Sequence, residues 1–428
     1  MVTHSDAQFE GTGCPHLGQQ YHPLEGSQLE HPYPFYAQAR REEPIFFSER
    51  LQAWIVTRYE DVRSILVQPD LFSSKDTLRP VVAFTPEVFQ VLATGYGFVP
   101  TITNTDGKEH MRFRAPLNQA FLPARLKSME GIIRAVANRL VDAFFNESRA
   151  DIIAQFAGPL PQEIILTLFG IPQTDLAQCK RWSDDAHAFT ASPLSPQRQL
   201  ECARNFVAFQ HYLATLVEKR SNTLSDDVVR CLLTIRPADT RPLTMAEMVI
   251  TLLGVLLAGH ETTTNLIGTA AYLLLSQPER WQHVCKHPED IPLAMEEVLR
   301  FDSPVQTFYR TALQETQVAE VIIPKGALLL VVYGSANRDE AQFLNPDRFD
   351  PHRSPNRHLA FGHGVHFCVG APLARLEGHI ALEVLSQRLP QLRLKPYQSL
   401  SHLPNLMFRG FVQLEVEWDE NLTSTAFS

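Results

Sequence analysis

The amino-acid sequence predicts a mainly α-helical protein with small β-sheets, an α+β fold class, for two reasons. Segments of β-prone residues are short and few, such as Ala53–Thr57 near the N-terminus. The longest periodic apolar stretch begins with a capping box at Thr244 and Glu247 and continues to about Ser276, before Pro278. A helix of that length would measure about 50 Å, enough to cross the whole protein.

Other helices are predicted in chain order from their start and stop signals. A short one is expected over Pro34–Arg41, and another begins at Tyr59 and ends before Pro69. Thr85 is a plausible N-cap with Pro86 at the first helical position. Two further helices are expected over 173–190 and 197–221.

Composition excludes several classes of protein. The chain has 428 residues, of which 44% are hydrophobic, and a net charge of −9. It can therefore bury a sizeable core, and it lacks the basic footprint of a nucleic-acid-binding protein. We expect a flexible N-terminal arm over 1–30, a single domain over 31–420 and a tail over 421–428.

The location of the protein follows from its cysteines and its N-terminus. Six cysteines are scattered without the spacing of a disulfide framework. The first residues are polar and lack the basic and apolar regions of a signal peptide or membrane anchor. The expectation is a cytoplasmic protein with no membrane segment.

A glycine-rich loop between Phe361 and Gly370 carries the strongest chemical signal. Three glycines bracket Cys368, and Pro372 near the start of the next helix precedes an apolar run to Leu389. A helix start just after the cysteine favours its thiolate, which suits a metal ligand or a nucleophile. No second cysteine lies nearby to complete a zinc or iron–sulfur site, so haem iron fits best. The alternative is a tight turn around a buried structural cysteine.

The pattern Phe-Gly-x-Gly-x-His-x-Cys-x-Gly resembles the haem-binding loop of the cytochrome P450 superfamily at every fixed position. This resemblance implies haem b with Cys368 as its thiolate ligand. It also implies that Phe361, Gly362, His366 and Gly370 contact the cofactor. The long central helix would then lie over the haem, with the cysteine loop on the opposite face.

The middle of the long, mostly apolar helix contains a short run of polar residues that includes Glu261 and Thr262. Thr262 lies four residues after Ala258, so its hydroxyl can bond that carbonyl and bend the helix, and Gly259 permits close approach of a flat cofactor. A polar contact between helices is the alternative. Together with Glu261 these residues resemble the oxygen-activation motif of the family, in which the acid and the alcohol deliver protons. His260 is interpreted as structural.

Basic residues are expected to bind the haem propionates. His110 and Arg114 lie at positions i and i+4 of a helix and point the same way. The resemblance assigns them, together with Arg310 and His366, to the propionates. Arg112 faces elsewhere and is expected to be solvated, within a basic patch for an acidic ferredoxin.

The pair Glu297 and Arg300, one helical turn apart, resembles a structural pair of the family. By itself a surface pair is the alternative. The resemblance implies a locked framework behind the thiolate loop, with Arg348 as the third member.

The resemblance also predicts the walls of a substrate pocket. A loop of apolar residues is expected over the haem, and for each residue burial within a surface loop is the alternative. The residues assigned to the pocket are Val81, Val82, Phe84, Val88, Phe98, Val305, Gln306, Thr307, Leu406 and Met407. Phe89, Leu92, Val99, Phe189 and Leu194 are expected nearby.

The resemblance implies a haem-thiolate monooxygenase that inserts one oxygen atom from O2 into a hydrophobic small molecule. About ten residues follow Trp418, so electrons are expected from a separate ferredoxin and an NAD(P)H-dependent ferredoxin reductase. One alternative is a peroxide-driven or coupling enzyme. The other is a haem-thiolate sensor, which would have no use for the acid and the alcohol.

Overall fold

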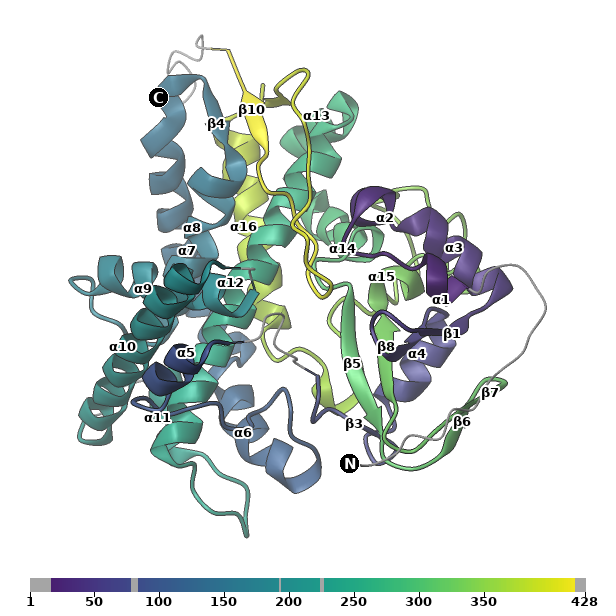
Figure 1. The fold of residues 1–428 in the computed structure, drawn as a ribbon. Helices are drawn as coiled ribbons and strands as arrows, with labels where there is room; N and C mark the ends of the chain where they lie inside the picture. The colour runs from purple at the N-terminus through teal and green to yellow at the C-terminus, as the bar shows by residue number, and fades with distance from the viewer. Residues whose placement is uncertain (1–16, 78–83, 192–193, 224–226, 420–428) are drawn as a thin grey trace.

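A computed structural model describes residues 17–77, 84–191, 194–223 and 227–419. Figure 1 shows two parts, one built mainly from helices and the other containing the largest sheet and the N-terminal helices. The predicted fold class, mainly α with small sheets, is confirmed.

Sixteen α-helices and four short 3₁₀ or π segments (η) are found in the described residues. In chain order they are α1 (Leu17–Gln20), α2 (Gly26–Glu30), α3 (Tyr33–Glu42), α4 (Tyr59–Leu66), α5 (Pro86–Leu92), α6 (Gly107–Ala120), α7 (Pro123–Phe144), η1 (Phe145–Glu147), η2 (Ile153–Ala157), α8 (Pro159–Leu168), α9 (Leu176–Ala191), α10 (Pro196–Ser221), α11 (Val228–Thr234), α12 (Met245–Leu275), α13 (Pro278–Lys286), η3 (Pro288–Asp290), α14 (Ile291–Phe301), α15 (Tyr333–Ala336), η4 (Gly364–His366) and α16 (Ala371–Arg388).

Three small sheets accompany them. The largest has the strand order β1 (Ile45–Ser48), β2 (Ala53–Val56), β8 (Leu328–Val332), β5 (Thr307–Ala312), β3 (Phe72–Ser73). Strands β2 and β8 are parallel and the other pairs are antiparallel. The second sheet is β4 (Arg149–Asp151), β10 (Glu415–Glu417), β9 (Arg393–Leu394), and the third is β6 (Thr316–Val318) with β7 (Val321–Ile323).

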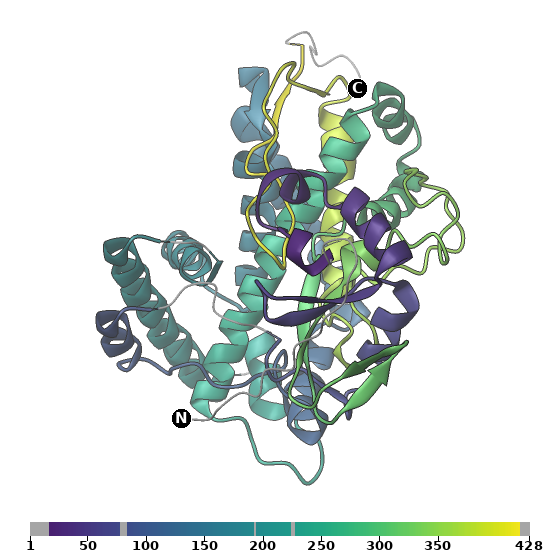
Figure 2. The same ribbon diagram turned by 45° about the vertical axis from the view of Figure 1, so that its right-hand side comes forward.

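Helix α12 is the long helix that the sequence predicts, and it runs through the middle of the helical part (Figures 1 and 2). Its capping box forms, with Thr244 and Glu247 bonded to each other's backbone N–H groups. By length and composition alone α12 could cross a membrane. Here it packs against α8, α10 and α16, so its apolar residues form the centre of a protein core.

The expected flexible arm is wrong for residues 17–30, which form α1 and α2, and α1 packs against β1 of the largest sheet. Tyr21 is 1% exposed, and its ring stacks on Phe35 at 5.3 Å and meets Phe46 edge-on at 5.7 Å. Arg409 donates to the carbonyls of Leu29 and Glu30. Aromatic burial and these charged hydrogen bonds hold a segment that looks merely polar and glycine-rich in sequence.

Candidate active site

The cysteine loop turns through two left-handed glycines, as its composition suggests. Gly362 and Gly364 have φ values of +70° and +72°. A Cβ atom on Gly364 would lie 2.6 Å from the carbonyl oxygen of Leu66, so no larger residue fits there. Gly370 instead has φ −83° and caps the start of α16.

The side chain of Cys368 is exposed, although the protein around it removes much of the bulk solvent. This desolvation raises the pKa of its thiol. The backbone N–H groups of Gly370 and Ala371 and the guanidinium of Arg114 oppose the rise, which is the helix-start effect expected from the sequence.

The predicted hydroxyl contact on α12 is present. Thr262 Oγ1 donates to the carbonyl of Ala258 at 2.7 Å. Thr264 makes the same kind of bond to His260, at 2.9 Å, but its methyl group lies on the side of Gly158. Ala258 is exposed in the middle of α12, so the turn that carries Thr262 borders open space.

Glu261 is buried, and desolvation raises the pKa of its carboxyl to about 7. Its Oε2 lies 3.4 Å from Nε2 of His187, on α9, whose side chain is 25% exposed. Burial lowers the pKa of His187. The acid is therefore held near neutrality beside an imidazole that reaches the surface of the protein. Sequence reasoning missed His187, because only tertiary packing brings α9 onto α12.

His110 and His366 come together as the resemblance implies, with ring centroids 4.3 Å apart. Burial, followed by the charges of His366 and Arg114, lowers the pKa of His110 to about 4. Its buried Nε2 has no hydrogen-bond partner among the described residues. His366 Nε2 lies 3.5 Å from Oδ1 of Asp106, a residue that sequence reasoning did not single out. Burial would raise the pKa of Asp106, but the His366 ring and the Ser73 hydroxyl lower it to about 2.

The two arginines assigned to the propionates are each held by a hydrogen bond to a backbone carbonyl. Arg114 donates to the carbonyl of Phe367, next to the cysteine, at 2.6 Å. Arg310 is buried on β5 and donates to Thr77 Oγ1 and to the carbonyl of Tyr309. Strand β5 pairs with β3, whose Ser73 donates to Asp106. One chain of contacts therefore links Arg310 to the His110 and His366 pair.

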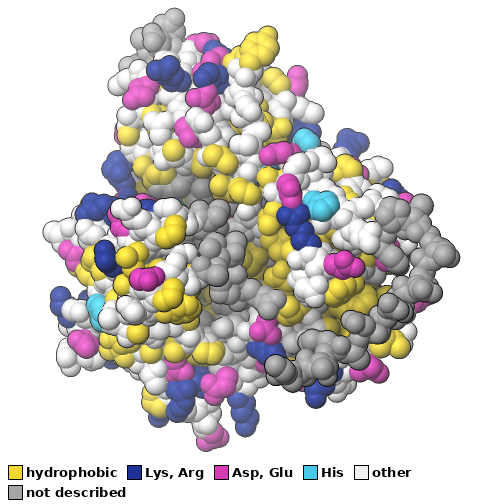
Figure 3. All heavy atoms as spheres, in the orientation of Figure 1, with side chains coloured by type: hydrophobic (Ala, Val, Ile, Leu, Met, Phe, Trp, Pro, Cys, Tyr) yellow, Lys and Arg dark blue, Asp and Glu magenta, His cyan; other side chains and the backbone are white. Residues whose placement is uncertain are grey.

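These residues fit a haem. The buried Nε2 of His110 lacks a partner among the described residues and could donate a hydrogen bond to a propionate oxygen. The two arginines supply positive charge for a carboxylate. Gly378 of α16 lies against Leu266 of α12, one turn beyond Thr262, so the helix that follows the cysteine packs beside the polar turn. Figure 3 shows a hollow between the helical and the strand-rich parts, with hydrophobic side chains on its visible walls.

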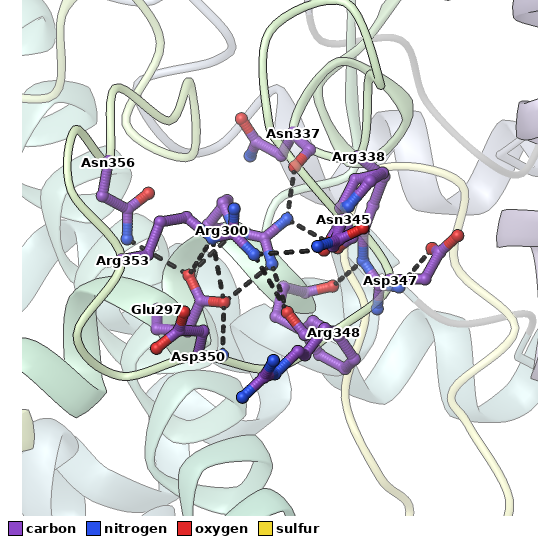
Figure 4. Close-up of polar contacts among 12 residues, drawn as sticks. Glu297, Arg300, Asn337, Arg338, Asn345, Asp347, Arg348, Asp350, Arg353 and Asn356 are labelled. Atoms are coloured by element: carbon purple, nitrogen blue, oxygen red, sulfur yellow. Dashed lines mark hydrogen bonds and ion pairs between the residues drawn. The ribbon is translucent and has the colours of Figure 1, made fainter.

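The framework pair Glu297 and Arg300 is fully buried and bidentate, with N–O distances of 2.8 and 2.7 Å. The assignment of Arg348 as its third member is wrong. The side chain of Arg348 is exposed, and only its carbonyl accepts from Arg300 (Figure 4). Arg353 instead places its Nε 3.3 Å from the Glu297 carboxylate. The loop turns between the two positions, which brings the second arginine inward.

A cluster of phenylalanine side chains connects the loop around α5 to α9 and α10. Phe84 stacks on Phe189 at 4.7 Å and on Phe98 at 6.4 Å. Phe206 contacts both Phe98 and Phe189, at 5.7 and 5.6 Å. Phe89 is 58% exposed and contacts this cluster through Phe84. Leu194 is partly buried against the helical core.

Other pocket residues lie differently from the expectation. Val88, like Leu92, is buried in the helical core and does not face open space. Gln306 Nε2 donates to the carbonyl of Ser303, and Thr307 Oγ1 donates to the carbonyl of Leu406, and both side chains are buried. The Thr307 hydroxyl and the backbone N–H of Gln306, which donates to the carbonyl of Met407, hold the turn that carries Leu406 and Met407. Val305, Val99, Leu406 and Met407 are partly buried, and Val81 and Val82 lie outside the described residues.

The expectation of a solvated Arg112 is also wrong. Arg112 is 3% exposed, and it donates to both carboxylate oxygens of Glu247, at 3.2 and 2.9 Å. It thereby ties α6 to the start of α12. Arg112 points away from Arg114 on α6, and for that reason the sequence predicts that it faces solvent. On that side of α6, however, its side chain meets the start of α12.

Comparisons with known proteins agree with this geometry. Residues 36–287 and 291–415 match the cytochrome P450 family. Mycinamicin IV hydroxylase/epoxidase of Micromonospora griseorubida is 37% identical over 372 residues, which cover 86% of this chain and 90% of that protein. The P450 heme domain of Tepidiphilus thermophilus superposes with a TM-score of 0.90 at 32% identity, covering 95% of this chain and 99% of that one.

An intact type IV self-sufficient cytochrome P450 monooxygenase gives a TM-score of 0.91 at 32% identity. The match covers 98% of this chain but 55% of that protein. A haem-binding fold with a single cysteine loop defines the class. The chain belongs to the cytochrome P450 family, and it is a cytochrome P450 monooxygenase.

Proposed function

We propose that this enzyme binds haem b through the Cys368 thiolate and inserts one oxygen atom from O2 into a hydrophobic small molecule. The observation that carries the proposal is that the Cys368 loop leads directly into α16, which packs against α12, the helix that carries Glu261 and Thr262. The bound haem supplies oxygen activation and electron storage. The catalytic domain would comprise residues 31–420.

The chain's own residues would bind the cofactor and move protons. His110, Arg114, Arg310 and His366 bind the propionates, with Asp106 orienting His366. Glu261 takes protons from solvent through His187 and passes them to the Thr262 hydroxyl, which borders the open space beside Ala258. A sensor without turnover has no need of a buried acid held near neutrality.

Replacing Thr262 by alanine is expected to uncouple the reaction. NAD(P)H consumption continues, whereas product per NAD(P)H falls by about tenfold or more, because the last proton donor is lost. Thr264→Ala is the matched control, since it removes the same type of bond on the opposite side of α12. Equal coupling in wild type and Thr262→Ala would remove Thr262 from the relay.

The relay should also show a pH dependence set by Glu261. Its carboxyl has a pKa of about 7, so the proton is present below that pH and is lost as pH rises through it. Product per NAD(P)H in the wild type should therefore fall above pH about 7. In the Glu261→Gln variant, product per NAD(P)H should be low and should not change as the pH rises through about 7. A Glu261→Gln profile that still falls near 7 would assign the titration to another group.

We infer that electrons come from a separate ferredoxin and its NAD(P)H-dependent reductase in the cytoplasm. Free cysteines at all five described positions suit a reducing compartment. The test compares turnover with ferredoxin, reductase and NAD(P)H against turnover with peroxide alone. Faster product formation with peroxide would favour the peroxide-driven alternative.

The substrate is proposed to be a lipophilic small molecule. The phenylalanines around Phe84 and the partly buried Val305, Leu406 and Met407 offer an apolar lining with few polar groups. The relative named for hydroxylation and epoxidation of mycinamicin IV is consistent with such a substrate. A spectral-shift screen of lipophilic compounds against the haem-loaded enzyme tests the class, and binding only of charged, polar compounds would contradict it.

A further inference from the structure

A cluster of metal-ligating side chains lies outside the site described above. His283 comes from the last turn of α13, Asp290 ends η3, and His352 belongs to the loop that follows Phe349. One ligand atom of each lies within 4.8 Å of the others. We propose that these three residues bind one divalent zinc ion.

The imidazoles surround one carboxylate. His283 Nε2 lies 2.7 Å from Asp290 Oδ2. The ring of His287 lies 4.8 Å from that of His283, and the ring of His352 meets His283 edge-on at 6.2 Å. The spacing of His283 and His287 places both on one face of a helical turn. Asp290 supplies the carboxylate oxygen of the cluster, and this oxygen is in direct contact with His283.

The donor set selects the type of ion. Imidazole nitrogens with one carboxylate suit zinc and related transition metals, whereas calcium and magnesium prefer oxygen ligands. Zinc bonds of about 2.0–2.2 Å place the donor atoms of a tetrahedral site about 3.4 Å apart. The histidines are exposed, and small rotations of their side chains close the remaining distance. The ion would take the place of the proton shared between His283 and Asp290.

The loop that carries His352 is already anchored. Asp350 donates its backbone N–H to Glu297 at 2.9 Å and accepts from the backbone N–H of His352, while Arg353 contacts the same glutamate. Helix α13 packs against α12 and α16. A bound ion would therefore cross-link this loop to the helices behind the cysteine loop, and it should raise the unfolding temperature.

The test uses tag-free, haem-loaded enzyme stripped of metal with a chelator. Zinc titration by calorimetry should saturate at one ion per chain, and zinc should raise the unfolding temperature reversibly with chelator. His283→Ala and His352→Ala should each weaken binding by about tenfold or more and abolish the thermal shift. Glu279→Ala, an exposed acid on the same helix, is the matched control and should bind as the wild type does.

Three results would overturn the proposal. The first is binding that does not saturate. The second is a His352→Ala variant that binds as tightly as the wild type, which would reduce the site to the His283 and His287 pair on one helical turn. The third is a zinc-induced thermal shift that persists in His283→Ala. The haem absorption spectrum of each variant reports separately whether the active site is intact.

Discussion

Cys368→Ser is expected to abolish the thiolate-type absorption of the reduced carbon monoxide complex, together with all oxygen insertion. A serine hydroxyl is a poor ligand for the iron, and the electron release that favours O–O cleavage requires the thiolate. The backbone turns at Gly362 and Gly364 do not depend on the sulfur, so the fold should persist. Absorption spectroscopy and a product assay measure the two losses.

The control is Cys285→Ser, which changes another cysteine that is not fully buried and should keep both properties. If the Cys368→Ser protein loses its haem altogether, Cys368→His provides a second measurement, because imidazole retains iron without thiolate character. An unchanged carbon monoxide spectrum in either Cys368 variant would refute the assignment of the ligand.

Glu297→Gln is expected to have the largest effect on stability. Its carboxylate is fully buried, accepts from Nε and Nη2 of Arg300 and accepts from the backbone N–H of Asp350 (Figure 4). Removing the charge leaves the Arg300 guanidinium buried without its counter-charge, which costs about 3–5 kcal/mol of unfolding free energy. Urea unfolding followed by haem absorbance should show a much lower midpoint than in the wild type. The yield of soluble protein should also fall.

Two arginines provide a matched comparison for this network. Arg353→Ala should destabilise the enzyme clearly, because its guanidinium contacts Glu297 and it is 8% exposed. Arg348→Ala should stay within about 0.5 kcal/mol of the wild type, since its side chain is exposed and only its carbonyl takes part. The reverse order would restore Arg348 as the third member of the framework.

Local features were predictable from the sequence because their partners lie within one element. The capping box of α12 joins residues three apart, and the Thr262 hydroxyl bonds a carbonyl four residues earlier. The left-handed glycines of the cysteine loop follow from residue type in the same way. Helical spacing also placed His110 and Arg114 on one face of α6.

Contacts between distant segments could not be read in this way. Periodicity gives the direction of a side chain from its own helix, but it does not say what lies opposite. It therefore left Arg112 in solvent, where the structure pairs it with Glu247, and it gave no sign that His187 meets Glu261.

By itself the sequence determined the family, the fold class and the cysteine loop, since these depend on residue types at fixed local spacing. Only the tertiary structure decided that Arg353 completes the framework, that α1 and Tyr21 pack on the sheet, and that His283, Asp290 and His352 converge. Each of these depends on how loops and helices far apart in the chain turn toward one another, which is set by packing of the whole core.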